Sequence, residues 1–211
     1  MKDSIKRSLK SSMHLFLLQI LIGGAAMAVE EPKFTVLLET EDYQVRSYPE
    51  ILIAETTVVG TFEGVGSDGF KILADYIFGN NKSNVKVAMT APVTQAPEGE
   101  KITMTAPVSQ QKLPSGYLIQ FTMPEKYTLD TLPVPNDSRI TIRLLPARKV
   151  AVYSYSGFWS ESRFEDKLAY FYQSLEKNGL KTKGVPIFAR FNSPFMLWFF
   201  RRNEIWLELE Q

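Results

Sequence analysis

A weak internal repeat is the feature that most restricts how this 211-residue chain can fold. Residues recur at a constant offset of 97 positions, and the matched pairs are Val45-Arg46 with Ile142-Arg143, Pro49 with Pro146, Ala54 with Ala151, Gly60 with Gly157, and Phe62 with Trp159. Each copy reads as a strand, a proline, a second strand and a glycine that precedes a helix. Because a repeated supersecondary unit is typical of a symmetric assembly, we expect an α+β fold. It would be a distorted β-barrel of two quasi-repeated β-rich halves, each flanked by one helix.

Two helices are predicted from the spacing of apolar residues. After the glycine-containing segment 60–68, apolar side chains at positions 70, 73, 74, 77 and 78 predict a helix over 70–78 that ends at Gly79. For the second helix, Ser162 and Glu165 can form a capping box. One face of this second helix is apolar and contains Phe164, Leu168, Phe171, Tyr172 and Leu175.

Short β-rich segments account for most of the remaining chain. Their composition predicts strands at 34–39, 43–48, 51–59, 85–93, 100–108, 116–123, 185–191 and 203–210. A proline-rich crossing loop is expected over 124–138. The segments 87–93 and 102–108 are near copies, VAMTAPV and ITMTAPV, joined through the turn 96–99. We therefore expect these two segments to pair as adjacent strands.

The first 28 residues have the pattern of an export signal. A basic region with Lys2, Lys6, Arg7 and Lys10 precedes the apolar run 15–24, and Ala26-Met27-Ala28 matches a cleavage site. A membrane-spanning helix needs about 20 apolar residues, and this run is half as long. We therefore expect a mature domain over 29–211 that is exported, periplasmic or secreted; an uncleaved anchor is the alternative.

The segment 29–211 contains neither histidine nor cysteine, because the single histidine of the chain is His14. Thiol chemistry, cysteine-based metal sites and imidazole acid–base catalysis are therefore excluded from this segment. Its carboxylates are scattered, so nothing in the sequence favours an enzyme. The segment has 20 basic and 22 acidic residues, a balance that lacks the basic surface of a nucleic-acid-binding protein. Its length fits one domain.

Three motifs resemble the SOUL haem-binding family. They are Tyr43-Gln-Val-Arg-Ser-Tyr-Pro49, the doubled Met-Thr-Ala-Pro-Val, and Asn192-Ser-Pro-Phe followed by Arg201-Arg202-Asn203-Glu204-Ile205-Trp206. The resemblance extends over about residues 33–210. It implies the distorted barrel with two quasi-repeats and two helices, and no established catalytic activity. It also implies that haem or a related porphyrin binds in a shallow apolar groove beside the first helix and under the late loop.

The resemblance places ligand-binding residues on the helix at 70–78 and on the loop at 193–200. On this basis the expected ligand-binding residues are Phe70, Lys71, Leu73, Ala74, Tyr76, Ile77, Phe78, Phe195, Leu197, Trp198, Phe199 and Arg201. Two other interpretations stay open. The helical residues could pack the helix onto the sheet, and the apolar run 194–200 could be a buried strand or a membrane contact.

The expected cofactor is haem b or another porphyrin, held without strong axial ligation. Some family members ligate the iron through histidine, and the segment 29–211 has none. Tyr76, Met89 and Met104 are the alternative iron ligands, although methionine commonly fills gaps in a core. Arg201 or Lys71 could pair with a propionate. The expected partner is thus a tetrapyrrole or amphiphilic small molecule; the alternative function is an envelope interaction or lipid-surface module that uses the aromatic loop 194–200.

Overall fold

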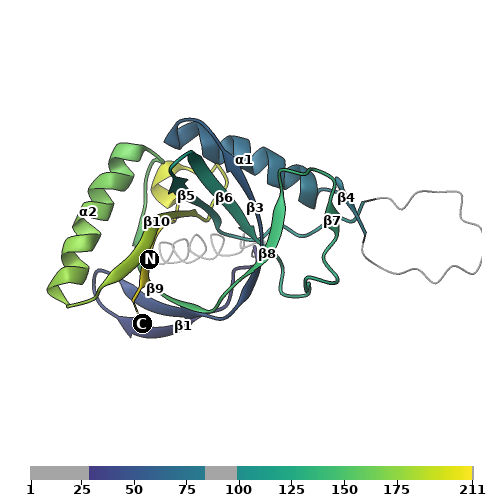
Figure 1. The fold of residues 1–211 in the computed structure, drawn as a ribbon. Coiled ribbons are helices and arrows are strands. Elements are labelled where there is room, and N and C mark those ends of the chain that lie inside the picture. The colour runs from purple at the N-terminus through teal and green to yellow at the C-terminus, as the bar shows by residue number, and fades with distance from the viewer. Residues whose placement is uncertain (1–28, 84–98, 211) are drawn as a thin grey trace, which may run out of the picture.

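The computed structural model describes residues 29–83 and 99–210 (Figure 1). The predicted export signal, Met89, the strand at 85–93 and the first copy of the short repeat lie outside the described residues. No helix within the described ranges has the length and apolar character needed to cross a membrane.

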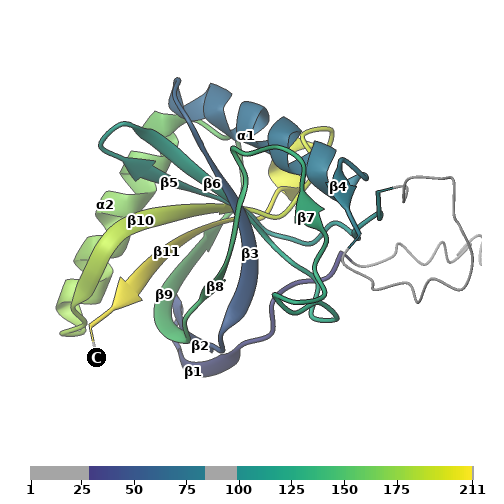
Figure 2. The ribbon, with the colours of Figure 1, turned by 45° about the vertical axis from the view of Figure 1, so that its right-hand side comes forward.

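Nine strands form one strongly curved antiparallel sheet (Figure 2). In spatial order they are β1 (Thr35–Glu39), β2 (Gln44–Tyr48), β9 (Arg148–Tyr155), β11 (Asn203–Leu209), β10 (Thr182–Arg190), β5 (Val108–Leu113), β6 (Gly116–Thr122), β3 (Ile51–Val58) and β8 (Thr141–Leu145). A separate short pair joins β4 (Asn81–Lys82) to β7 (Val134–Pro135), which lies inside the predicted crossing loop. The segment 100–108, predicted as a strand, forms only a bridge at Thr105 before β5 begins.

Strand bounds in the two halves of the sheet are related by the same offset as the repeat. β2 and β8 are offset by 97 residues, and so are β3 and β9. β2 pairs with β9, and β3 pairs with β8. Each short strand therefore pairs with the long strand of the other half, so the two halves are interlocked.

The sheet is open, and the prediction of a β-barrel is wrong. In the described part of the chain, β1 and β8 are the two edges and do not pair with each other. A barrel requires the edge strands to join. Here the chain instead turns from β2 into β3 through Pro49-Glu50, and from β8 into β9 through Pro146-Ala147. Proline has no N–H to donate to a ladder, and β1 adds a further strand outside β2. The α+β class with two helices is confirmed.

Helix α1 (Phe62–Ile77) packs across β3 and β6 and begins eight residues before the predicted start. Thr61 caps it, because its Oγ1 accepts a hydrogen bond from the Gly64 N–H at 3.2 Å. Two of the three glycines in the predicted lead-in segment, Gly64 and Gly66, instead lie within the helix. A Cβ on Gly69 would come within 2.4 Å of the Ile119 Cγ1. Glycine is therefore used here for close contact between helix and sheet.

Replacing Gly69 by alanine is expected to destabilise the protein by up to about 2 kcal/mol. Overpacking against Ile119 costs about 1–3 kcal/mol, and the better helix propensity of alanine returns about 1 kcal/mol. Urea unfolding would measure the change. Gly64→Ala is the matched control, because its methyl group would meet the Thr61 hydroxyl at 3.1 Å; this variant is expected to be neutral or more stable. Equal stability of the two variants would contradict the packing argument.

Helix α2 (Glu161–Lys177) covers the other half of the sheet (Figure 1). Its N-cap is Ser160 rather than Ser162, and the Ser160 Oγ accepts from the Arg163 N–H at 3.3 Å. Phe171 and Leu175 of the predicted apolar face are buried in one cluster with residues of β2, β9 and β11. A larger cluster lies beneath α1. The two helices thus close two neighbouring parts of the core.

Candidate ligand-binding site

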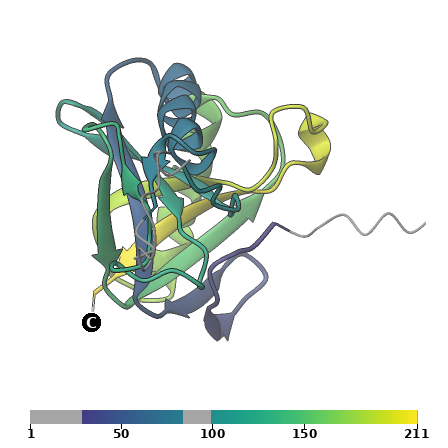
Figure 3. The same ribbon diagram turned by 90° about the vertical axis from the view of Figure 1, so that its right-hand side faces the viewer.

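The connection between β10 and β11 projects from the body of the molecule and carries an exposed aromatic surface (Figure 3). We call residues 192–202 the aromatic loop; it includes a short 3-10 helix, η1 (Trp198–Phe200). Phe195 is 94% exposed, and every residue from Met196 to Phe200 is exposed as well. The run 194–200 is therefore a surface loop rather than a buried strand. Phe158, from the connection before α2, stacks on Trp198 with ring centroids 5.2 Å apart.

Hydrogen bonds within the loop hold this surface in one shape. The Arg201 Nε donates to the Met196 carbonyl at 2.8 Å, and its Nη2 donates to the Pro194 carbonyl at 2.7 Å. At the base of the loop, the Arg202 N–H donates to the Asn192 Oδ1 at 2.6 Å. These bonds satisfy backbone groups that no sheet partner reaches. The aromatic rings are thus presented by an ordered loop.

The two adjacent arginines of the loop have different partners. Arg202 forms an ion pair with Glu31 at 2.6 Å and lies 3.7 Å from a carboxylate oxygen of Glu204. Arg201 lies over the ring of Trp159, 4.4 Å from its centroid, and in the described structure it forms no ion pair. Arg202 therefore stabilises the fold, whereas the charge of Arg201 is available to a ligand.

Most of the predicted residues on the first helix lie in the core. The buried face of α1 includes Leu73, Ala74, Tyr76 and Ile77. Three others are at least partly accessible: Phe70, which contacts Phe121 with centroids 5.5 Å apart, Lys71, which pairs with Asp68 at 3.2 Å, and Phe78, which is exposed. That the helical residues contact a ligand stays a prediction. Among the predicted ligand-binding residues, most of the exposed apolar surface belongs to Phe195, Leu197, Trp198 and Phe199.

Neither Tyr76 nor Met104 is arranged as an iron ligand. The Tyr76 hydroxyl donates to the Pro133 carbonyl at 2.7 Å, and burial raises the pKa of this phenol well above its ordinary value. Met104 is half-buried against the cluster beneath α1. In the described ranges no group of three or more histidine, cysteine, aspartate or glutamate side chains is placed to hold a metal ion.

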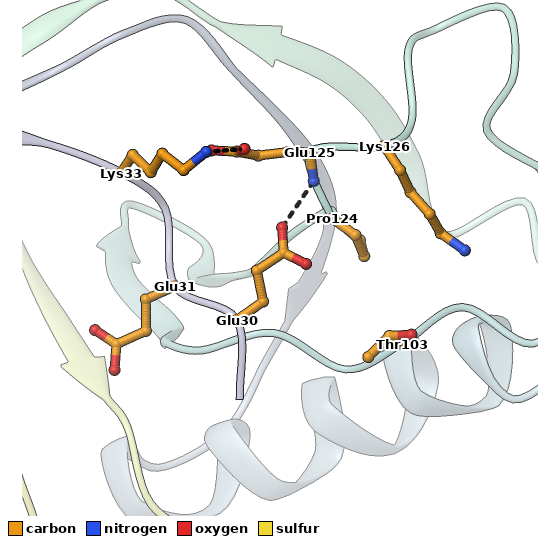
Figure 4. A pocket seen from close by; sticks show the side chains of 7 residues that line it. All are labelled: Glu30, Glu31, Lys33, Thr103, Pro124, Glu125 and Lys126. Atoms are coloured by element: carbon orange, nitrogen blue, oxygen red, sulfur yellow. Dashed lines mark hydrogen bonds and ion pairs between the residues drawn. The ribbon is translucent and has the colours of Figure 1, made fainter. Parts of the chain in front are cut away.

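Two cavities of the described structure border the elements of the predicted groove, since Glu31 of the larger pairs with Arg202 of the aromatic loop and Phe62 of the smaller belongs to α1. The larger, of about 410 Å³, is lined by the charged or polar side chains of Glu30, Glu31, Lys33, Thr103, Glu125 and Lys126, together with Pro124 (Figure 4). In this cavity the Glu125 N–H donates to the Glu30 carboxylate at 2.8 Å. The smaller cavity, of about 160 Å³, lies between α2 and the sheet. Ligand pockets are usually about 300–1,000 Å³ and mostly apolar. The smaller cavity lies below this range, and the larger lies within it but is bordered by charged side chains.

Two residues at the base of the aromatic loop were missed from the sequence. Trp159 and Arg190 lie together there, with the Arg190 guanidinium 5.2 Å from the Trp159 ring centroid. The Trp159 Nε1 donates to the Asn203 Oδ1 at 2.7 Å, which fixes the indole against β11. Arg190 is the only charged residue in the segment 185–191, which is otherwise apolar. This contrast could have marked it as a candidate site residue.

A model of the family described as SOUL heme-binding protein matches residues 29–208. The chain belongs to this family. A human relative, heme-binding protein 2, is 30% identical over 190 residues, which cover 87% of this chain and 88% of that protein. The resemblance inferred from the three sequence motifs is therefore confirmed.

Solved structures with low sequence identity have the same fold. The C-terminal domain of EcmrR aligns with a TM-score of 0.52 and 16% identity, over 80% of this chain and 98% of that chain. A hydrolase from Listeria innocua aligns with a TM-score of 0.56 and 11% identity, over 82% of this chain and 94% of that chain. At these identities the similarity concerns the fold alone.

Proposed function

We propose that this protein binds a tetrapyrrole, haem b or another porphyrin, on the surface formed by the aromatic loop and Phe158. The exposed apolar run from Phe195 to Phe200, held in one shape by Arg201, carries the proposal. Membership of a family described as heme-binding supports it. Exposed apolar patches of this kind are uncommon on soluble proteins and mark binding surfaces.

The binding mechanism is contact between flat apolar groups. The parallel stack of Phe158 and Trp198, with 19° between the ring planes, offers a planar surface to a planar macrocycle. Burying about 400 Å² at roughly 25 cal/mol/Å² gives on the order of 10 kcal/mol. Association costs offset several kcal/mol of this. The expected affinity is therefore micromolar.

The iron contributes little to this affinity, because the segment 29–211 has no histidine or cysteine and the Tyr76 hydroxyl is bonded within the core. Haemin and metal-free protoporphyrin IX are expected to bind the segment 29–211 with micromolar affinities that differ by less than about tenfold. Visible-absorbance titration would measure both, and the haemin spectrum should lack strong low-spin features. A hundredfold preference for haemin would contradict ring recognition and require an axial ligand.

We also propose that residues 1–28 direct export of the protein. Their basic region, apolar run and Ala26-Met27-Ala28 support this assignment. Cell fractionation and mass spectrometry of the protein expressed with its own N-terminus are the test. Export with an N-terminus at Val29 is the expected result, and full-length protein in the cytosol would contradict it.

A lipid-surface function is the second candidate, because Phe195 at the projecting loop is 94% exposed. Aromatic side chains of this kind insert at the level of lipid headgroups. Co-sedimentation with liposomes separates the two functions. Strong sedimentation that is lost in a Trp198→Ser, Phe199→Ser variant, together with no porphyrin binding, would favour the lipid surface.

A further inference from the structure

Arg190 is a buried cation with no counter-ion in the described part of the chain. Its side chain extends from the end of β10, and the residue is 8% exposed. The guanidinium lies so close to Gly66 of α1 that a Cβ there would come within 2.0 Å of the Arg190 Nη2. The ring of Phe188 lies 5.8 Å from the guanidinium carbon on the sheet side. The groups packed around Arg190 are therefore a glycine and aromatic rings.

In the described part of the chain, no carboxylate pairs with Arg190, and its Nε has no hydrogen-bond partner. Burial lowers the pKa of this guanidinium to about 10, which still leaves it charged at neutral pH. An unpaired buried charge is costly to a folded protein. A structural arginine at such a position would be expected to have a carboxylate or several carbonyl oxygens around it.

Arg201 lies over the same indole ring. Its guanidinium carbon is 4.4 Å from the Trp159 centroid, and that of Arg190 is 5.2 Å from it. Arg201 donates its Nε and Nη2 hydrogens to loop carbonyls, and its Nη1 has no hydrogen-bond partner among the described residues. Two uncompensated cations thus flank one ring, directly beneath the aromatic surface of the loop.

We infer that Arg190 and Arg201, arranged around Trp159, form an anion-binding site for the carboxylates of a ligand that lies on the aromatic loop. This inference rests on the proposed function, since the ligand's apolar body would occupy the loop. A tetrapyrrole fits this chemistry because its propionate arms extend beyond the macrocycle. A carboxylate that reaches the Arg190 guanidinium, of a residue that keeps 8% of its surface exposed, would supply the missing counter-ion, and such charge-assisted hydrogen bonds are stronger than neutral ones.

The test compares an acid with its ester in wild-type and variant proteins. Protoporphyrin IX and its dimethyl ester, in the same mild detergent, are titrated into the wild type, Arg190→Met and Arg148→Met. Arg148 is the matched control, because its Nε also lacks a partner and burial lowers its pKa, while it lies at the end of β9 remote from the loop. Thermal unfolding of all three proteins is recorded in parallel.

Arg190→Met is expected to weaken binding of the acid at least tenfold and binding of the ester less than twofold. Its thermal stability should equal or exceed that of the wild type, because an uncompensated charge is removed. Arg148→Met should bind both probes as the wild type does. Equal weakening of acid and ester, or a loss of stability in Arg190→Met, would overturn the anion site and leave the proposed function intact. Failure of the wild type to bind either probe would overturn both.

Discussion

Replacing Glu204 by alanine is expected to destabilise the protein by about 3–5 kcal/mol, the range measured when one partner of a buried ion pair is removed. Glu204 is 1% exposed. Its carboxylate accepts from the Arg46 Nη1 and Nη2 at 3.0 and 3.2 Å and from the Trp206 Nε1 at 2.6 Å. The Ser154 hydroxyl donates to it at 3.3 Å. The alanine variant leaves these donors, including one buried cation, without their acceptor.

The size of this effect follows from the position of the pair in the sheet. Arg46 lies on β2 and Glu204 on β11, on either side of β9, so the ion pair crosses the strand that joins them. Arg46 also lies over the Phe34 ring at 4.4 Å. Loss of the carboxylate therefore affects the contact between β2 and the rest of the sheet as well as the charge balance.

Urea unfolding monitored by circular dichroism would measure the loss of stability in Glu204→Ala. Glu125→Ala is the control, since it removes a carboxylate from the exposed pair with Lys33; exposed pairs contribute little. The double replacement Arg46→Met, Glu204→Leu should recover much of the loss, because an apolar pair needs no counter-charge. A Glu204→Ala variant as stable as Glu125→Ala would show that the buried pair is not required.

Replacing Trp198 and Phe199 together by serine is expected to weaken porphyrin binding by about 50- to 100-fold. The two rings would supply about 100 Å² of apolar contact to the ligand, worth roughly 2.5 kcal/mol, and each 1.4 kcal/mol is a factor of ten in affinity. Both side chains are exposed in the free protein and lie outside the core clusters. The fold should therefore persist.

Absorbance titration with protoporphyrin IX would measure this change, with near-ultraviolet circular dichroism as the check on folding. Tyr172→Ser is the matched control, because Tyr172 is an exposed aromatic residue on α2 and outside the aromatic loop. The control should bind as the wild type does. If neither the double variant nor the control changes the affinity, the ligand does not bind at the aromatic loop.

Local patterns were sufficient to predict several elements. The apolar spacing of Phe171 and Leu175 predicted a helix with one buried face, and this face packs on the sheet. Pro194 and its polar neighbours indicated a loop as one of the interpretations of 194–200, beside a buried strand, and the structure has the loop. These predictions depend on interactions within a few residues along the chain, such as turn chemistry and helical periodicity.

Long-range contacts account for what the sequence did not reveal. The glycines at 60, 64 and 66 indicate a loop when read locally, but Gly64 and Gly66 belong to α1, and Gly66 and Gly69 let this helix approach Arg190 and Ile119. Tyr76 was a candidate ligand, yet its hydroxyl is bonded to Pro133 more than 50 residues away. The distinct roles of Arg201 and Arg202 depend likewise on Trp159 and Glu31.

The sequence alone indicated the family, through its resemblance in three motifs. It also determined the α+β class, the apolar faces of the helices and the exclusion of histidine and cysteine chemistry from 29–211, because these depend on composition or local spacing. Only the tertiary structure decided that the sheet stays open, that Leu73, Ala74, Tyr76 and Ile77 are core residues, and that Arg190 and Arg201 lie against Trp159 with no carboxylate partner among the described residues. These features arise where distant segments meet. Local sequence patterns do not show which distant residues come into contact. Strand pairing and burial in the folded chain decide this.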